Sequence, residues 1–256
     1  GTEVTASRLI KYFDGAVAES QSDITDNTVK RLAWKGDMAE DDFAYIRNNM
    51  ASTLEVLDLS ATTLTELPTR ALAFYSDQGY NGNNTLHTVI LPETLIKTGW
   101  AAFAYCTSLT YCSLPDRGTN QLPAGLTEIG TYCFMNTALK QMNMKDTQIK
   151  IIPESAFDGC KNLKEVTFPS GLVTIGENAL NECSFTSITL PASLTEIQGF
   201  AFLSCDNLRF VTCEATTPPT LGRMVFPNKV YQLTVPNGYV DTYKATSWNN
   251  YFENIQ

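Results

Sequence analysis

The sequence repeats one short pattern along most of its length. The pattern L-x-x-V-x-L-P occurs as "LHTVILP" at 86–92, "LTYCSLP" at 109–115, "LKEVTFP" at 163–169 and "FTSITLP" at 185–191. Copies without the proline begin at 54, 139 and 208, and "YQLTVP" at 231–236 is a degenerate last copy. From residue 139 onward, successive copies are 24, 22 and 23 residues apart. A fixed period of this length predicts a solenoid, in which stacked repeats cover one another's apolar faces.

Each repeat predicts a strand with one buried side. In "KEVTF" the side chains alternate, so Val166 and Phe168 face the interior while Glu165 and Thr167 face solvent. The proline that follows lacks a backbone donor and ends the strand. Since one repeat cannot bury its apolar residues alone, the strands of successive repeats are expected to lie parallel on one face.

The rest of each repeat is expected to return the chain to the start of the next strand. In "VTIGENALNEC" at 173–183, Ile175 points inward, Gly176 permits a turn, and a short helical turn packs Leu180 and Cys183 against the interior. The predicted fold is therefore an α/β repeat solenoid, with parallel strands on one face and short helical turns or loops on the other.

The seven cysteines occupy apolar positions of this repeat. We expect them to be reduced and buried, where a free cysteine behaves as a small hydrophobic residue. A disulfide framework favours an even number of cysteines, and a zinc site needs paired cysteines or histidine partners, which the sequence lacks. The positions are Cys106, Cys112, Cys133, Cys160, Cys183, Cys205 and Cys213.

The repeat resembles the BspA-like leucine-rich repeats of bacterial surface and secreted proteins. The resemblance rests on segments such as "SLTEIQGFAFLSCDNL" at 193–208 and on the tail "LTVPNGYVDTYKATSWNNYFENI" at 233–255. It implies a curved right-handed solenoid, usually exported or anchored at the surface, that serves in adhesion or recognition without catalytic residues or cofactors. This sequence departs from the pattern at Leu180, where the family has Phe, and at 142–157, which lacks the Leu-Pro step.

Three segments are predicted. Residues 1–50 form an N-terminal cap of helix, strand and helix, residues 51–228 form the solenoid, and residues 229–256 form a degenerate repeat and a C-terminal cap. Caps are needed because the terminal repeats of a solenoid expose apolar surface. An aromatic group at the C-terminus also suits a sugar or an apolar ligand, but capping is the favoured interpretation. The expected capping side chains are Phe43, Ile46, Met50, Val240, Tyr243, Trp248, Phe252 and Ile255.

Charge and hydropathy narrow the class of partner. The net charge is −9 and no long Lys/Arg cluster occurs, which argues against binding to nucleic acid or to anionic lipid. No apolar run approaches the roughly 18–20 residues of a membrane span. The sequence begins with Gly and lacks a signal peptide, so we expect that an export signal or lipid anchor has been removed and that the monomeric protein is extracellular or at the cell surface.

The sequence gives little support for an enzyme. His87 is the only histidine, and no G-x-S-x-G, P-loop, G-x-G-x-x-G or H-E-x-x-H motif occurs. On the predicted strand face, only Asp58 and Glu165 are carboxylates, and they lie on non-neighbouring strands, unlike a glycosidase pair. The Asp/Asn-rich stretch at 76–84 lacks the spacing of a calcium loop. We therefore expect no cofactor and no metal.

The outward strand positions are the candidate binding surface. They include Val56, Asp58 and Ser113, and among them Tyr111 and Phe210 are the large aromatic side chains suited to anchor a partner. A protein of a host or bacterial surface is the first expected partner, a glycan is the second, and a passive spacer is the third interpretation. Insertions at 75–85 and 116–123 are an alternative site. The candidate residues are Tyr111, Phe210, Ile90, Gln141, Asn143, Glu165, Thr167, Thr189 and Thr212.

Overall fold

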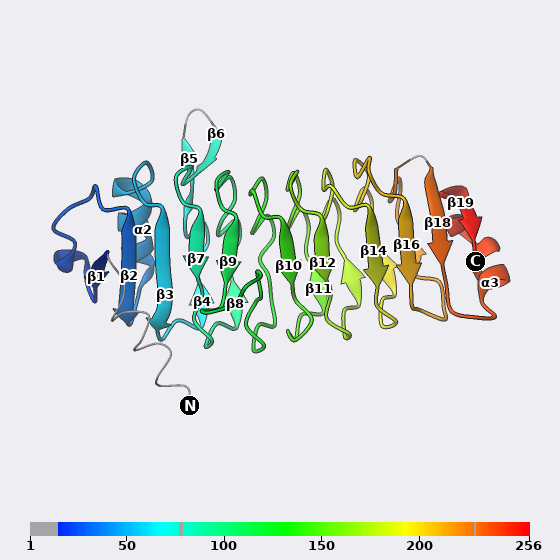
Figure 1. Ribbon diagram of the computed structural model, residues 1–256, viewed down its shortest axis with the longest axis horizontal. Helices are drawn as coiled ribbons and strands as arrows, with labels where there is room; N and C mark the ends of the chain where they lie inside the picture. Colours follow the sequence, from blue (N-terminus) through cyan, green and yellow to red (C-terminus); the bar gives the residue numbers. More distant parts are fainter. Residues whose placement is uncertain (1–14, 77–78, 228) are drawn as a thin grey trace.

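The computed structural model describes residues 15–76, 79–227 and 229–256. It is an elongated solenoid whose longer strands lie side by side along the molecule (Figure 1). We call the surface that these strands form the strand face. The predicted repeat solenoid with parallel strands is confirmed, whereas the first expected helix of the N-terminal cap falls outside the described residues. The strands of this face are β1 (Ala16–Ala18), β2 (Arg31–Gly36), β3 (Val56–Thr62), β7 (Thr88–Ile90), β9 (Tyr111–Ser113), β10 (Gln141–Asn143), β12 (Glu165–Thr167), β14 (Ser187–Leu190), β16 (Phe210–Cys213), β18 (Val230–Thr234) and β19 (Phe252–Ile255).

A second parallel sheet runs along the solenoid behind the strand face. It consists of two-residue strands. In three of them the second residue is a fully buried isoleucine, namely Ile152, Ile175 and Ile197. The repeat pattern predicts only a returning segment here, because two residues are too short to show an alternating pattern. These strands are β11 (Ile151–Ile152), β13 (Thr174–Ile175), β15 (Glu196–Ile197) and β17 (Thr220–Leu221), with β4 (Glu66–Leu67) and β8 (Lys97–Thr98) paired nearer the N-terminus.

The turns between the two sheets are not helical. Residues 177–182 form hydrogen-bonded turns, with Asn178 and Glu182 at φ values of 54° and 56°. Positive φ is incompatible with a right-handed helix, so the short helical turns predicted for these segments are corrected to plain turns. Within the described residues, the helices are η1 (Gln21–Asp23), α2 (Glu40–Asn49), α3 (Val240–Lys244) and η2 (Ser247–Asn250).

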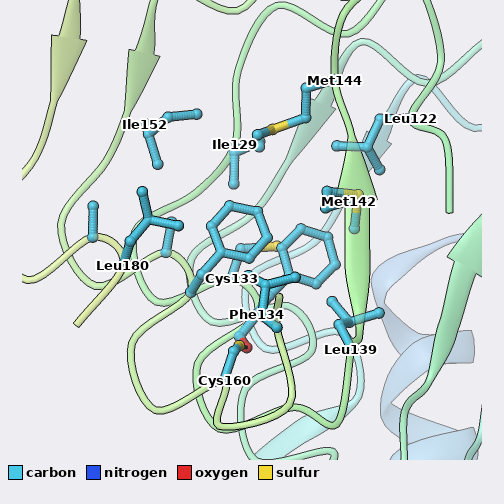
Figure 2. Close-up of a cluster of buried hydrophobic side chains, with 14 of the residues drawn as sticks. Leu122, Ile129, Cys133, Phe134, Leu139, Met142, Met144, Ile152, Cys160 and Leu180 are labelled. Carbon is cyan, nitrogen blue, oxygen red and sulfur yellow. Dashed lines mark hydrogen bonds between the residues drawn. The ribbon is translucent and has the colours of Figure 1, made fainter. Parts of the chain in front are cut away.

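A ladder of phenylalanine rings fills the space between the sheets. Phe134 stacks on Phe103 at 5.4 Å and on Phe157 at 5.2 Å between ring centroids. Figure 2 shows Phe134 beside Cys133, Cys160 and Leu139 in the interior. Phe202 and Phe226 form a second stack at 5.4 Å. Leu180 occupies the position between the two stacks, so the ladder is interrupted in that repeat.

All seven cysteines are free and buried, as predicted. The Cys160 thiol donates to the Phe134 carbonyl oxygen at 3.0 Å. Burial raises the pKa of the Cys160 thiol to about 11 and the pKa values of Cys106, Cys133 and Cys205 to about 12. The thiols therefore stay protonated in the folded protein and serve as core side chains.

Apolar side chains are buried near both ends of the described solenoid. At the N-terminal end the terminal strand is β1, and α2 lies behind β2 and β3 (Figure 1). Helix α2 buries Phe43 and Ile46, and Met50 follows at its end. Its first turn is acidic, which suits a helix N-terminus. At the other end Tyr243, Trp248, Phe252 and Ile255 are buried and Val240 is half-buried. The Trp248 Nε1 donates to the Pro219 carbonyl oxygen at 2.8 Å, and β19 adds one more strand beside β18.

The ladder of strand pairs on the strand face is interrupted twice. Pairing runs from β1 to β9, from β10 to β12, and from β14 to β19. Backbone pairing is therefore missing between β9 and β10 and between β12 and β14.

Both interruptions follow a link that is one residue shorter than the links before the paired strands. Two residues separate Cys160 from Leu163 at the entry to β12, and the Leu163 N–H donates to the Cys160 carbonyl oxygen at 2.9 Å. The links from Cys106 to Leu109 and from Cys205 to Leu208 have the same length and the same bond, also at 2.9 Å. A single residue remains in the links that lead into β10 (137–139) and β14 (183–185). The short link removes this turn, and the strand that it leads into does not pair with the strand before it.

Candidate functional site: a groove in the strand face

The first interruption, between β9 and β10, is sealed by the insertion at 116–123. Asn120 is buried, its Oδ1 accepts from the Cys112 N–H at 3.0 Å, and its Nδ2 donates to the carbonyl oxygens of Thr110 at 3.1 Å and Gln141 at 3.0 Å. The Asn143 N–H donates to the Asn120 carbonyl oxygen at 2.9 Å. The insertion therefore replaces the missing strand pairing through Asn120, while its residues 116–119 remain exposed.

The second interruption, between β12 and β14, is an open groove that encloses about 680 Å³. All residues of β12 and β14 are described, and the two strands belong to different sheets. A sheet edge without a partner strand leaves backbone N–H and C=O groups without their usual hydrogen bonds. The groove is lined by Lys145, Lys164, Glu165, Val166, Thr167, Phe168, Ser170, Thr186, Ser187, Ile188, Thr189, Pro191 and Glu214.

The floor of the groove is apolar. Val166 is only half-buried, whereas the residues at the same strand position in neighbouring repeats, Met142 and Ile188, are buried. The alternating pattern predicts Val166 inside, and Val166 does pack against the core. Its partial exposure follows from the absence of a paired strand on its β14 side.

The rim of the groove is polar and carries both signs of charge. Glu165, Thr167 and Thr189 are exposed on the two flanking strands. The ammonium groups of Lys145 and Lys164 and the carboxylate of Glu214 complete the charged lining. An apolar floor within a polar, charged rim is the usual composition of a protein-binding surface.

The structure brings three of the nine predicted site residues together in this groove, namely Glu165, Thr167 and Thr189. Ile90, Gln141, Asn143 and Thr212 are half-buried on other strands of the face. The Asn143 side chain is used locally, because its Oδ1 accepts from the Lys145 N–H at 3.0 Å. The sequence could indicate the outward face, but it could not indicate which two strands would separate.

Tyr111 contributes to the seal of the first interruption. It is half-buried, and its hydroxyl donates to the carbonyl oxygen of Arg117 at 2.6 Å. Three other positions expected to face solvent are buried, namely Val56, Asp58 and Ser113. Ser113 is covered because its hydroxyl donates to the insertion at the carbonyl oxygen of Thr119, at 3.1 Å. The Asp58 carboxylate turns back onto its own strand and accepts from the Ser60 N–H at 2.8 Å.

Phe210 stands in an exposed aromatic pair on the strands that follow the groove. Phe210 is 47 % exposed and Tyr231 is 48 % exposed, and their rings meet edge to face with 5.7 Å between centroids. We call this pair the aromatic shelf. Strand β16, which carries Phe210, pairs directly with β14, the groove's second wall. The repeat pattern does not predict Tyr231 as a site residue, because the outward positions of the degenerate last repeat are Gln232 and Thr234 and Tyr231 comes before them.

The other insertion behaves differently from 116–123. Strands β5 (Ala73–Ser76) and β6 (Gly79–Gly82) pair as an antiparallel hairpin that projects from one edge of the solenoid (Figure 1). In the described part of the chain, no group of three His, Cys, Asp or Glu side chains is placed to hold a metal ion. His87 is exposed, and its Nε2 lies 3.9 Å from Glu55 Oε2. None of the described helices has the length and apolar character of a membrane span.

Comparisons with known proteins identify the repeat. Residues 61–124 and 127–243 match, in six copies, the family described as "BspA type Leucine rich repeat region". No curated protein matches the chain. A leucine-rich repeat protein from Bacteroides ovatus is similar in structure, with a TM-score of 0.53, 18 % identity, and coverage of 90 % of this chain and 59 % of that one.

A leucine-rich cell surface protein from Faecalibacterium prausnitzii gives a TM-score of 0.47 and 21 % identity, over 69 % of this chain and 54 % of that one. The chain thus spans between half and two thirds of the length of these two relatives. The similarity to the Bacteroides ovatus protein concerns the fold alone.

Proposed function

Because the chain belongs to the BspA type leucine-rich repeat family, we propose that it is a non-enzymatic recognition module that binds a protein partner through its strand face. The groove between β12 and β14 carries this proposal. It combines an apolar floor, exposed hydroxyls and unpaired strand edges within one concavity. We further propose that the protein acts outside the cell or at its surface, in adhesion or a related contact.

The arrangement of the groove favours an extended polypeptide as the bound element. A peptide that lies over the groove can contact its side chains and the backbone groups of β12 and β14, while side-chain pockets provide selectivity. Cα atoms of the two strands come within 8 Å of each other, which is too close for a whole strand to enter between them, since neighbouring strands lie about 4.8 Å apart. Val166 and Ile188 supply apolar contacts at the floor, and the lysines and glutamates at the rim select for charge on the partner. Binding is favoured over catalysis because repeats of this family are typically non-enzymatic.

A glycan is the second candidate ligand, because the aromatic shelf offers ring surface beside the groove. Phe210 and Tyr231 are both about half exposed. The exposed hydroxyls of Ser187 and Thr189 lie on β14, the strand that pairs with the Phe210 strand β16. A glycan that stacks on the shelf would depend on these rings and much less on the groove walls.

The test combines a screen with matched variants. Host extracellular matrix proteins and a glycan array are screened, and each hit is titrated against Thr167→Arg and Thr189→Arg, which fill the groove from exposed positions. Thr195→Arg, at an exposed threonine outside the groove, is the control. We expect the groove variants to weaken a protein partner by about thirtyfold, the loss of a typical anchor, and the control to bind normally.

A second pair of variants, Phe210→Ala and Tyr231→Ala, separates the two ligand classes. If these variants abolish binding and the groove variants do not, the glycan candidate replaces the protein candidate. If folded groove and shelf variants all bind as well as the parent, the strand face is not the binding surface and the proposal fails.

A further inference from the structure

A second concavity lies away from the strand face, on the turns of two neighbouring repeats. It encloses about 220 Å³ and is lined by Trp100, Ala101, Ala104, Tyr105, Tyr132 and Met135. The Trp100 and Tyr132 rings meet edge to face, with 5.8 Å between centroids and 73° between planes. We call this feature the aromatic cleft. It is smaller than cavities for drug-sized ligands, which enclose about 300–1,000 Å³, so it suits one small chemical group.

The aromatic cleft is not a requirement of the repeat. Trp100 lies three residues before Phe103, and the matching position before Phe157 is Glu154. Met135 follows Phe134 directly, and the matching residue after Phe157 is Asp158. The later repeat thus has carboxylates where the cleft has an aromatic ring and a thioether. The small buried side chains of Ala101 and Ala104 leave the hollow between the larger ones.

A carboxylate lies at the edge of the aromatic cleft. The Tyr132 hydroxyl donates to Glu154 Oε1 at 2.6 Å. Glu154 is exposed, and no Lys or Arg side chain is among the described residues that line the cleft. This carboxylate and the net charge of −9 for the whole chain favour a positively charged ligand over an anionic one.

From these observations we propose that the aromatic cleft binds a small organic cation, specifically a trimethylammonium group such as that of choline. Ring faces attract cations through their quadrupoles, and cages of Trp and Tyr are a known solution for quaternary ammonium groups. Trp100, Tyr105 and Tyr132 supply the rings, the alanines supply the space, and Glu154 supplies the counter-charge. This site is independent of the strand-face groove.

The chain carries a built-in probe for this proposal. Of its three tryptophans, Trp34 and Trp248 are buried in the core and only Trp100 lines the cleft. Choline is titrated into the full chain while tryptophan fluorescence is recorded. We expect a saturable change that disappears in Trp100→Phe, while the choline methyl signal in ligand-observed NMR still reports binding by that variant.

Two comparisons decide whether charge matters. The neutral isostere of choline, in which a tert-butyl group replaces trimethylammonium, is expected to bind at least about tenfold more weakly. Glu154→Gln is expected to weaken choline about threefold to tenfold, within the range of a partly exposed charge interaction. Glu177→Gln changes the equivalent glutamate one repeat later, outside the cleft, and is expected to bind like the parent. Phosphatidylcholine vesicles in a parallel titration distinguish a lipid headgroup from a soluble ligand.

Three results would overturn the proposal. The first is the absence of any saturable response to millimolar choline in fluorescence and NMR. The second is equal binding of the neutral isostere, which would make the cleft merely apolar. The third is normal choline binding by Trp100→Ala that retains its fold by circular dichroism, because that variant removes a ring that the proposal requires.

Discussion

The two interruptions of the strand face share a short link and have opposite outcomes. Both follow a link that is one residue short, at 137–139 and at 183–185. At the first, Asn120 joins β9 to β10 with three side-chain hydrogen bonds, and the ring stack from Phe103 to Phe157 continues beneath it. At the second, no insertion fills the gap and Leu180 interrupts the ring ladder.

The difference shows how a regular repeat acquires a local site. A lost strand pairing costs hydrogen bonds, and one interruption is compensated by a buried asparagine. The other is left open, and its side chains and strand edges become available to a partner. The stability of the solenoid is therefore expected to depend strongly on the sealed interruption, while binding depends on the open one.

Removal of the central ring at the sealed interruption should have the largest effect. Phe134→Ala empties a site stacked on both sides and is expected to lower the free energy of unfolding by about 3–5 kcal/mol. Chemical denaturation of the variant and parent measures the change. Phe210→Ala removes a similar ring from the exposed shelf and serves as the control, with a change of about 0.5 kcal/mol or less. Equal losses in both variants would contradict the distinction between core ladder and surface shelf.

Asn120→Ala should open the sealed interruption. The substitution leaves the Cys112 N–H and the carbonyl oxygens of Thr110 and Gln141 without their partner. Since an unsatisfied buried group costs about 1–3 kcal/mol, we expect a total loss of about 2–4 kcal/mol in denaturation. Hydrogen exchange should also speed up at the Cys112 amide. Asn207→Ala, at an exposed asparagine of a later repeat, should change neither quantity; a stable, well-protected Asn120→Ala protein would show that the insertion is dispensable.

Alkaline pH should lower the free energy of unfolding through the buried thiols. Burial raises the pKa of the Cys160 thiol to about 11, while an unfolded thiol titrates near 8.5–9. Above about pH 9 the unfolded state loses protons that the folded state keeps, so stability falls as pH rises toward 11. Each such thiol contributes about 1.4 kcal/mol per pH unit in this window. Denaturation is measured at a series of pH values between 8 and about 10.5. The free energy of unfolding should fall less steeply with pH for Cys160→Ala than for the parent, and equal slopes would exclude this linkage.

Lengthening the short link at 183–185 should close the groove with the smallest change in stability. One Asn inserted after Ser184 restores the link length found between Cys160 and Leu163. We expect β14 to pair with β12, with a gain of about 1 kcal/mol from the new hydrogen bonds and slower exchange of amides in 187–189. Binding by the groove should be lost in the same variant. An Asn inserted after Thr25, in the exposed stretch 25–28, is the control. Unchanged exchange at 187–189 after the link insertion would mean that link length does not set the interruption.

Much of the candidate site was visible in the sequence, but its centre was not. Alternation within "KEVTF" placed Glu165 and Thr167 outside, and the groove contains both. The same reasoning placed Ser113 and Asp58 outside, where they are buried, because alternation gives the direction of a side chain and not what covers it. Tyr231 escaped notice because the last repeat is degenerate. The aromatic cleft combines side chains from two repeats, which no pattern within one repeat describes.

By itself the sequence determined the solenoid, the alternation of its strands and the burial of all seven cysteines. These features follow from a local pattern that recurs with the repeat, and each copy confirms the others. The tertiary structure decided which strands pair, that Asn120 seals one interruption, that the other remains open, and that Trp100 and Tyr132 share a cleft. Those outcomes depend on whether neighbouring repeats come within hydrogen-bonding or packing distance, and a single residue in a link is enough to change that distance.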